Sequence, residues 1–195
     1  MISIQPKWVA KICRGEKTVE VRKTKPKLET PFKCYIYCTK GRGDCLWRWG
    51  GGVWYDTQFP NERPNRLDGK IIGEFVCDRI VQFENSWYDP AFYETSDLSC
   101  VGFEELAIYI GKKDFGYGWH ITDLVVYDEP RELSEFYHYC GDDPNCSGCE
   151  AHYFSNTECG KEDYCCSPIE GCKPIKRAPQ SWQFCVATEP RQTAD

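Results

Sequence analysis

The chain has 195 residues, of which 41% are hydrophobic and 15% aromatic, so we expect a folded globular protein rather than a disordered one. No apolar run is long enough to span a bilayer, and the N-terminus lacks a signal-peptide pattern, which predicts a cytoplasmic protein. The net charge of −6 is unevenly distributed: residues 1–80 carry 16 Lys and Arg against 9 Asp and Glu, whereas residues 81–195 carry 8 against 21. This asymmetry indicates either a basic binding face on an acidic body or a dipolar surface that only aids solubility.

Hydrophobic periodicity predicts many short elements. Pro6 suits the first turn of a helix and Gly15 suits its end, so a helix is expected between them. In chain order we expect helices at 6–14, 102–110 and 131–138, and strands at 18–23, 32–39, 70–83, 119–127 and 181–187. Several short strands with few helices predict an α+β protein built around a small, mostly antiparallel β-barrel.

Residues 15–22 concentrate ionisable side chains in a short segment. Strand alternation places Glu20 and Arg22 on one face, with Lys17 at the start of the strand. This spacing suits a site for a polar ligand, either anionic or nucleobase-like. It equally fits a solvated strand face, where exposed ion pairs contribute about 0–1 kcal/mol.

The pattern Gly15-x-Lys17-x-x-Glu20-x-Arg22 after a short helix resembles the signature of the ASCH domain, a branch of the PUA-like superfamily. Residues 2–8, 35–40 and 69–75 resemble further blocks of that family in the same order. Residues 117–121 and 179–182 resemble the last two strand entries of phage and gut-bacterial members. The resemblance covers about residues 1–137 and 178–188 and implies a PUA-like pseudobarrel with flanking helices.

ASCH and PUA-like domains are associated with RNA, often modified RNA or its nucleosides, so the resemblance implies an RNA- or modified-nucleotide-binding module. Such a module would use Lys17 and Glu20 with five residues around the same cleft: Arg22, Lys23, Lys40, Tyr117 and Trp119.

Two alternatives remain open. Some small bacterial members hydrolyse the acetyl amide of N4-acetylcytidine, which would make Lys17 a base and Glu20 a proton shuttle. Those enzymes carry threonine three positions after the lysine, where this chain has Glu20. Paired with Arg22, Glu20 could instead orient the base of a bound nucleotide without catalysing a reaction. The third reading is a protein-interaction or phage accessory protein.

A long segment at residues 41–68 interrupts the predicted barrel. It interleaves tryptophans with arginines around three consecutive glycines at 50–52. Its aromatic rings could stack on unpaired bases, or they could fold back over the mouth of the barrel, which suits Trp47 and Trp54 better than Trp49.

Seven of the fourteen cysteines lie between residues 140 and 172, in a stretch with few aliphatic residues. Because reducing compartments do not maintain ordinary disulfides, clustered cysteines predict a structural zinc ion. The Cys146-x-x-Cys149 knuckle is expected to supply two ligands, with Cys166 and Cys172 as the chosen second pair. The predicted organisation is a barrel at 1–138 and 178–188, a cysteine-rich zinc-binding insertion at 139–177 and a flexible tail at 189–195. Cys13, Cys34, Cys77 and Cys185 are expected to be small buried side chains.

Overall fold

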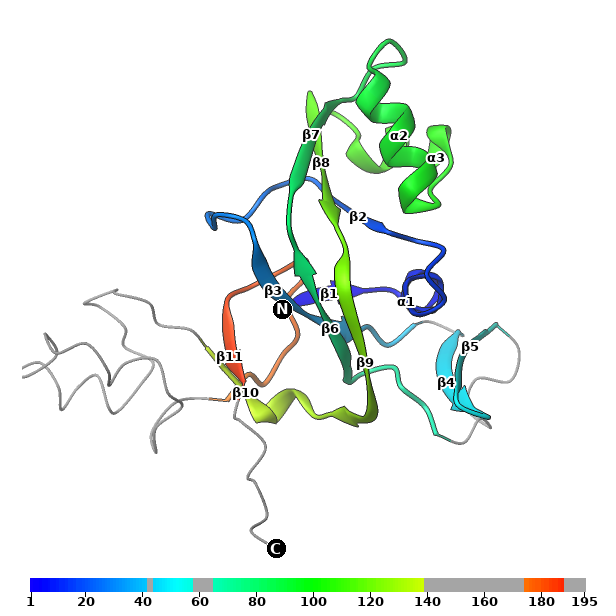
Figure 1. The fold of residues 1–195 in the computed structure, drawn as a ribbon, viewed down its shortest axis with the longest axis vertical. Coiled ribbons are helices and arrows are strands. Elements are labelled where there is room, and N and C mark those ends of the chain that lie inside the picture. The colour runs from blue at the N-terminus through cyan, green and yellow to red at the C-terminus, as the bar shows by residue number, and fades with distance from the viewer. Residues whose placement is uncertain (42–43, 58–64, 139–173, 188–195) are drawn as a thin grey trace, which may run out of the picture.

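The computed structural model describes residues 1–41, 44–57, 65–138 and 174–187 (Figure 1). Its α-helices are α1 (Pro6–Cys13), α2 (Pro90–Ser99) and α3 (Phe103–Ile110). Its strands are β1 (Ile2–Ile4), β2 (Val19–Arg22), β3 (Phe32–Cys38), β4 (Cys45–Trp49), β5 (Gly52–Asp56), β6 (Ile71–Cys77), β7 (Ile80–Glu84), β8 (Phe115–His120), β9 (Thr122–Arg131), β10 (Phe136–His138) and β11 (Cys185–Ala187). The predicted α+β class is confirmed.

The described strands form four sheets. The largest has the order β1-β3-β6-β9, in which β1 is parallel to β3 and the other neighbours are antiparallel. A second sheet, β2-β8-β7, is wholly antiparallel, and β4-β5 and β10-β11 are two-stranded. The predominance of antiparallel pairing was predicted correctly, but no closed barrel is formed by the described strands.

Two predicted strands each divide between the two main sheets. The expected strand at 70–83 is β6 in the first sheet and β7 in the second, separated by Asp78 and Arg79. The expected strand at 119–127 lies across β8 and β9, which divide in the same way at Ile121. The two breaks lie side by side, because the amide of His120 donates a hydrogen bond to the carbonyl oxygen of Arg79 at 3.1 Å.

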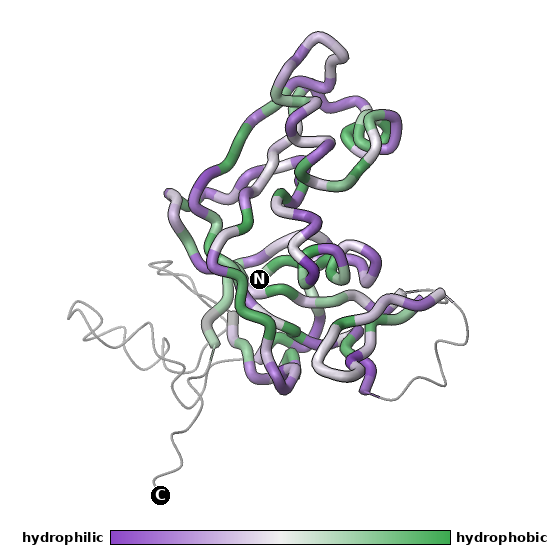
Figure 2. Tube along the Cα trace, turned by 45° about the vertical axis from the view of Figure 1, so that its right-hand side comes forward, coloured by the Kyte–Doolittle hydropathy of each residue, from purple (hydrophilic) through white to green (hydrophobic). Residues whose placement is uncertain are grey.

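Helix α1 begins where the sequence predicted and ends one residue earlier, at Cys13. Pro6 occupies its first position, where the missing N–H costs nothing, and Gly15 follows it with a φ of 73°. Val9, Ala10 and Ile12 are buried in the main hydrophobic core, which also contains β1, β3 and β6 side chains. In Figure 2 hydrophobic stretches run along these central strands.

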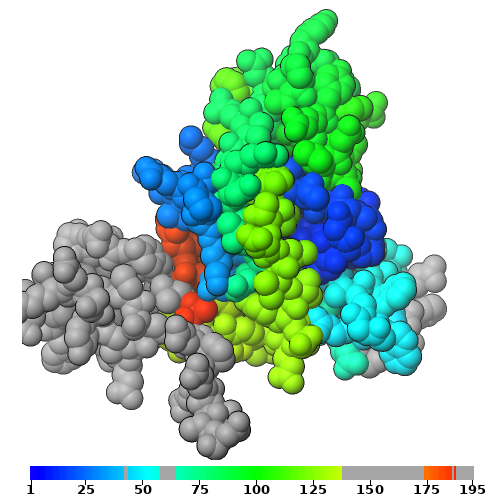
Figure 3. All heavy atoms as spheres, viewed as in Figure 1, coloured from blue at the N-terminus to red at the C-terminus, as the bar shows by residue number. Residues whose placement is uncertain are grey.

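Helix α2 was not predicted, although its start carries a clear signal. Asp89 caps the helix, because its carboxylate accepts a hydrogen bond from the amide of Ala91 at 3.0 Å, and Pro90 occupies the first turn. Helices α2 and α3 form the upper lobe in Figure 3 and bury Phe92, Leu106 and Ile110 against the second sheet. Their contact with β8 is close because Gly116 has no side chain: a Cβ there would lie 2.7 Å from the Cδ1 of Ile110.

Two other segments differ from the sequence prediction. The expected loop at 41–68 contains the hairpin β4–β5, which turns at Gly50 and Gly51, two glycines with positive φ angles. The expected helix at 131–138 is a single 3-10 turn, Leu133–Glu135, followed by β10. Strand β10 pairs with β11, the described end of the chain, and Phe136 packs against Ile175 in a third hydrophobic cluster.

Candidate functional site

Three side chains of the motif meet in one ion-pair cluster, which we call the charged triad: Lys17, Glu20 and Arg22. The Nζ of Lys17 is 3.2 Å from one carboxylate oxygen of Glu20. The Nη2 of Arg22 is 3.0 Å from the other oxygen. Glu20 therefore lies between two cations and pairs with each through a separate oxygen.

The charged triad is almost fully enclosed. The side chains of Lys17, Glu20 and Arg22 are 2%, 7% and 10% exposed. Burial of this kind carries a desolvation penalty that is offset only when every charge keeps its partners. The interpretation as a solvated strand face is wrong for these side chains, which form an enclosed cluster.

Backbone carbonyls add a hydrogen bond to each cation, while the Nε of Arg22 stays buried without an acceptor among the described residues. Lys17 donates from Nζ to the carbonyl oxygen of Ser99 at 2.9 Å, and Arg22 donates from Nη2 to that of Ser3 at 2.6 Å. The Nζ of Lys17 also lies 5.3 Å from the ring centroid of Trp8, within the range of a cation–π interaction. Side chains from the turn after α1 and from β2 are thus tied to α1, to the end of α2 and to β1.

Sequence reasoning did not identify Ser3 and Ser99, since both act through backbone oxygens that carry no residue-type signal. The tertiary fold, rather than local spacing, brings these groups to the motif.

Burial lowers the pKa of Lys17 below its ordinary value of 10.5, and the attraction of Glu20 opposes this effect. Among the causes that act on this ammonium, desolvation is the largest. A buried lysine with a lowered pKa is more easily deprotonated than an exposed one, which is a property shared by structural and catalytic lysines.

Two of the predicted ligand-binding residues lie directly opposite the charged triad. In the pairing of β2 with β8, Glu20 faces Trp119 and Arg22 faces Tyr117. Opposite residues of an antiparallel pair share one face of the sheet, so the triad and these rings form two adjacent rows. Trp119 is 1% exposed.

The two other predicted ligand-binding residues lie outside this cluster. Lys23 follows β2 and places its Nζ 5.0 Å from the ring centroid of Tyr109. Lys40 lies beyond the end of β3, where its aliphatic chain covers Gly69. Of these two lysines, Lys23 therefore stays next to the motif strand and Lys40 belongs to a different part of the surface.

The arginine of the hairpin β4–β5, Arg48, is held by hydrogen bonds to the backbone of β9. Arg48 donates from Nη1 and Nη2 to the carbonyl oxygens of Asp128 and Tyr127, at 2.5 Å each. Trp49 and Trp54 are 63% and 52% exposed, so neither covers the main core, whereas Trp47 is half-buried.

The predicted zinc ligands Cys146, Cys149, Cys166 and Cys172 lie outside the described residues. Within the described part of the chain, no group of three or more His, Cys, Asp or Glu side chains could hold a metal ion. Of the four cysteines expected to be buried, Cys34 and Cys77 are buried, and Cys13 and Cys185 are partly buried; all four are free thiols.

None of the helices in the described ranges has the length and hydrophobicity needed to cross a membrane.

Comparisons with known proteins give one kind of match. A scan against protein-family models found none that fits, and no curated protein matches the sequence. The chain is similar to solved ASCH structures. The crystal structure of ASCH from Zymomonas mobilis is 19% identical, with a TM-score of 0.48 over 68% of this chain and 71% of that one. Structures of two mutants of that protein are 18% and 19% identical, each with a TM-score of 0.46, and cover 73% and 72% of their chains.

These structures carry the name of the family whose signature residues 15–22 resemble. What this chain binds or does must be inferred from its own side chains.

Proposed function

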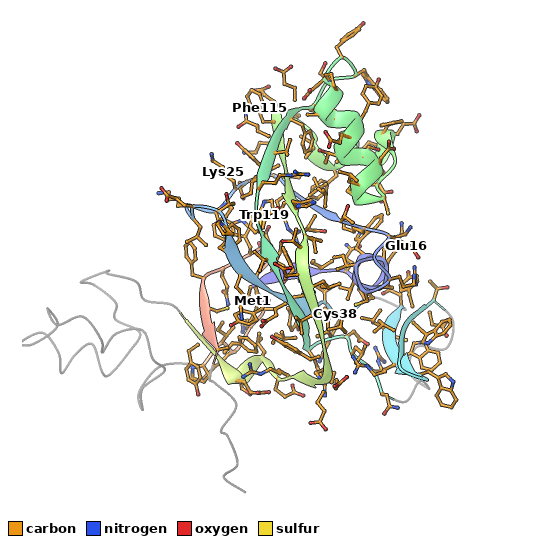
Figure 4. The ribbon with its side chains drawn as sticks, in the orientation of Figure 1. Met1, Glu16, Lys25, Cys38, Phe115 and Trp119 are labelled. Carbon is orange, nitrogen blue, oxygen red and sulfur yellow. The ribbon has the colours of Figure 1, made fainter. Side chains whose placement is uncertain are left out.

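We propose that this protein is an RNA- or modified-nucleotide-binding module of the ASCH/PUA-like type. The observation that carries the proposal is the loop that leaves the motif strand, residues 23–31. It presents Lys23, Lys25 and Lys27, all exposed, and none of them forms an ion pair with another described residue. Figure 4 shows Lys25 on this loop, which we call the lysine loop. Exposed cations without carboxylate partners are suited to contact phosphates.

The charged triad supports this role by positioning the loop. Arg22 is the last residue of β2, and its guanidinium is fixed by Glu20 and by the carbonyl of Ser3. The lysine loop begins at the next residue. Since the triad cations are enclosed and already paired with Glu20, the exposed lysines of the lysine loop are the better candidates for phosphate contact.

Salt dependence tests the proposal. Binding of fluorescently labelled single-stranded RNA is measured by anisotropy between about 50 and 200 mM salt, a range in which phosphate contacts weaken strongly. Each contact to a single strand contributes about 0.7 to the slope of log K against log salt, so changing Lys23, Lys25 and Lys27 together to Gln should reduce the slope by about 2.

A charge-matched control uses three exposed lysines elsewhere, Lys7, Lys112 and Lys113, each changed to Gln. This control should keep the wild-type slope. Equal losses in both triple variants would mean that net charge, not the lysine loop, drives binding. Absence of binding at the lowest salt would overturn the proposal.

A second function, amidohydrolysis of an acylated nucleoside, is favoured by one observation: the lowered pKa of Lys17, which suits a general base. Incubation with N4-acetylcytidine should then release acetate, and Lys17→Met should abolish the release. Two features oppose this function. The ammonium of Lys17 is enclosed, and this chain has Glu20 at the position where the N4-acetylcytidine hydrolases of the resembled family have threonine. No acetate at high protein concentration would remove this substrate.

A further inference from the structure

A pocket with several aromatic rings in its wall opens beside the lysine loop. Its cavity volume is about 220 Å³. We call it the aromatic pocket and define it by Phe32, Trp119, Trp182, Gln183 and Phe184, with Leu28 at its edge. None of these residues belongs to the charged triad, although Trp119 faces Glu20 across β2 and β8.

Segments that are distant in sequence build this pocket. Pro26 and Leu28 come from the lysine loop, Phe32 from β3, Trp119 from β8 and Trp182 from the segment before β11. A hydrogen bond joins two of these segments, because the indole of Trp182 donates from Nε1 to the hydroxyl of Thr24 at 3.2 Å. The lysine loop is therefore part of the pocket wall and not only its neighbour.

The rings form a continuous series. The centroids of Phe32 and Trp119 are 5.7 Å apart, those of Trp119 and Trp182 are 6.0 Å apart, and those of Trp182 and Phe184 are 5.6 Å apart. Tilted and edge-on contacts between 53° and 87° hold the rings at angles to one another. Angled rings leave ring faces that do not stack on each other.

Two polar groups at this pocket have no acceptor. The indole Nε1 of Trp119 and the side-chain Nε2 of Gln183 are buried and make no hydrogen bond to any described residue. A buried donor without an acceptor is costly and uncommon, so each such group in a folded protein calls for a partner. Trp119 is 1% exposed, so neither solvent water nor a molecule in the pocket reaches its Nε1 unless the surrounding side chains move, and binding in the pocket does not depend on these two donors.

We propose that the aromatic pocket receives one unstacked nucleobase, whose flanking phosphates lie along the lysine loop. This inference rests on the proposed function and adds to it the place where a base is read. A base offers flat faces on which the rings of the pocket wall can stack, and its flanking phosphates suit the exposed lysines beside it. The cavity is smaller than the roughly 300–1,000 Å³ of sites for drug-sized ligands, which suits a single base.

The first test observes the tryptophan indoles directly, without altering the pocket. The chain has seven tryptophans, and each gives one indole N–H signal in a nitrogen–proton NMR spectrum. Trp→Phe variants at positions 119, 182 and 54 assign three of them. Addition of a single-stranded RNA pentanucleotide should shift the signals of Trp119 and Trp182 and leave that of Trp54, on the β4–β5 hairpin, unchanged.

The second test measures affinity. Trp182→Ala should weaken binding of the pentanucleotide about 5- to 140-fold, which corresponds to the loss of one stacked base. Trp54→Ala is the matched control, since it removes an exposed tryptophan outside the pocket, and it should change binding less than twofold. Circular dichroism spectra and melting temperatures of both variants establish that they are folded.

Titration with nucleoside monophosphates distinguishes a base within an RNA strand from the base of a free nucleotide. If the pentanucleotide shifts the same signals at far lower concentration than the four nucleoside monophosphates, the occupant is a base within a strand. If the monophosphates bind equally well, the occupant is a free nucleotide. If RNA binds with the expected salt slope but the Trp119 and Trp182 signals do not move, the pocket inference is wrong and the proposed function stands. If no RNA binds, both are wrong.

Discussion

Lys17 and Glu20 form an ion pair of 3.2 Å in which neither side chain is more than 7% exposed. The pair lies at the junction of α1, α2 and β2, and Arg22 completes it on the other side. A carboxylate that pairs with two enclosed cations cannot be removed without leaving both of them without a charged partner. Glu20 is therefore the member of the charged triad on which the other two depend.

Glu20→Gln should be strongly destabilising. It preserves the shape of the side chain but removes the charge, so the free energy of unfolding should fall by about 3–5 kcal/mol. Urea denaturation followed by tryptophan fluorescence measures this change. The matched control is Glu16→Gln, which alters an exposed carboxylate paired with Arg14, and its denaturation midpoint should remain close to that of the wild type. Similar losses of unfolding free energy in both variants would mean that the burial of the charged triad does not determine how much it contributes to stability.

The lowered pKa of Lys17 has a consequence for stability in alkaline solution. Desolvation holds its folded-state pKa below the ordinary 10.5, so between these two values the unfolded chain binds more protons than the folded chain. The contribution of Lys17 to the free energy of unfolding therefore rises as the pH increases through this window. Below the folded-state pKa the contribution is constant and unfavourable.

Comparison with Lys17→Met isolates this contribution, since the variant keeps the length of the side chain and cannot titrate. The difference in unfolding free energy between wild type and variant should change with pH as 10.5 is approached from below, in favour of the wild type. Denaturant titrations at several alkaline pH values provide the measurement. A difference that is independent of pH would show that Lys17 titrates normally in the folded protein.

The sequence predicted those features that depend on local pattern. The limits of α1 follow from Pro6 and Gly15, and the proximity of Glu20 to Arg22 follows from strand alternation. It did not predict the enclosure of the triad, because the groups that cover it come from residues 8, 99 and 119, which no local spacing connects to the motif.

Errors in the predicted elements have similar physical causes. The stretch 70–83 reads as one apolar strand, and only its partners reveal that Asp78 and Arg79 separate two sheets. Helix α2 has few apolar residues at helical spacing, so the capping signal of Asp89 and Pro90 was not supported by periodicity. The hairpin β4–β5 was read as a loop, because its three glycines suggested a break rather than a turn between paired strands.

Gly116→Ala should destabilise the packing of α3 on the second sheet. A methyl group at this position would meet the ring of Phe83 and the side chain of Ile110, both fully buried. Overpacking of this kind typically costs about 1–3 kcal/mol. Thermal unfolding of the variant and the wild type measures this cost, and equal melting temperatures would mean that α3 shifts without cost.

Zinc removal tests the remaining prediction of the sequence. Residues 139–177 have too few aliphatic side chains to fold by burial, and they contain the Cys146-x-x-Cys149 knuckle. We propose that Cys166 and Cys172 complete a structural zinc site with this knuckle. Protein purified under reducing conditions should then contain at least about one equivalent of zinc by elemental analysis.

A chelator should increase proteolytic cleavage within residues 140–175 and leave the remainder of the chain resistant, because the hydrophobic clusters of the described sheets contain none of these cysteines. Cys149→Ser should produce the same cleavage without chelator, whereas Cys100→Ser, which changes a cysteine outside this region, should not. Zinc well below one equivalent, with the clustered cysteines paired as disulfides, would contradict both the metal site and the reducing compartment on which it depends.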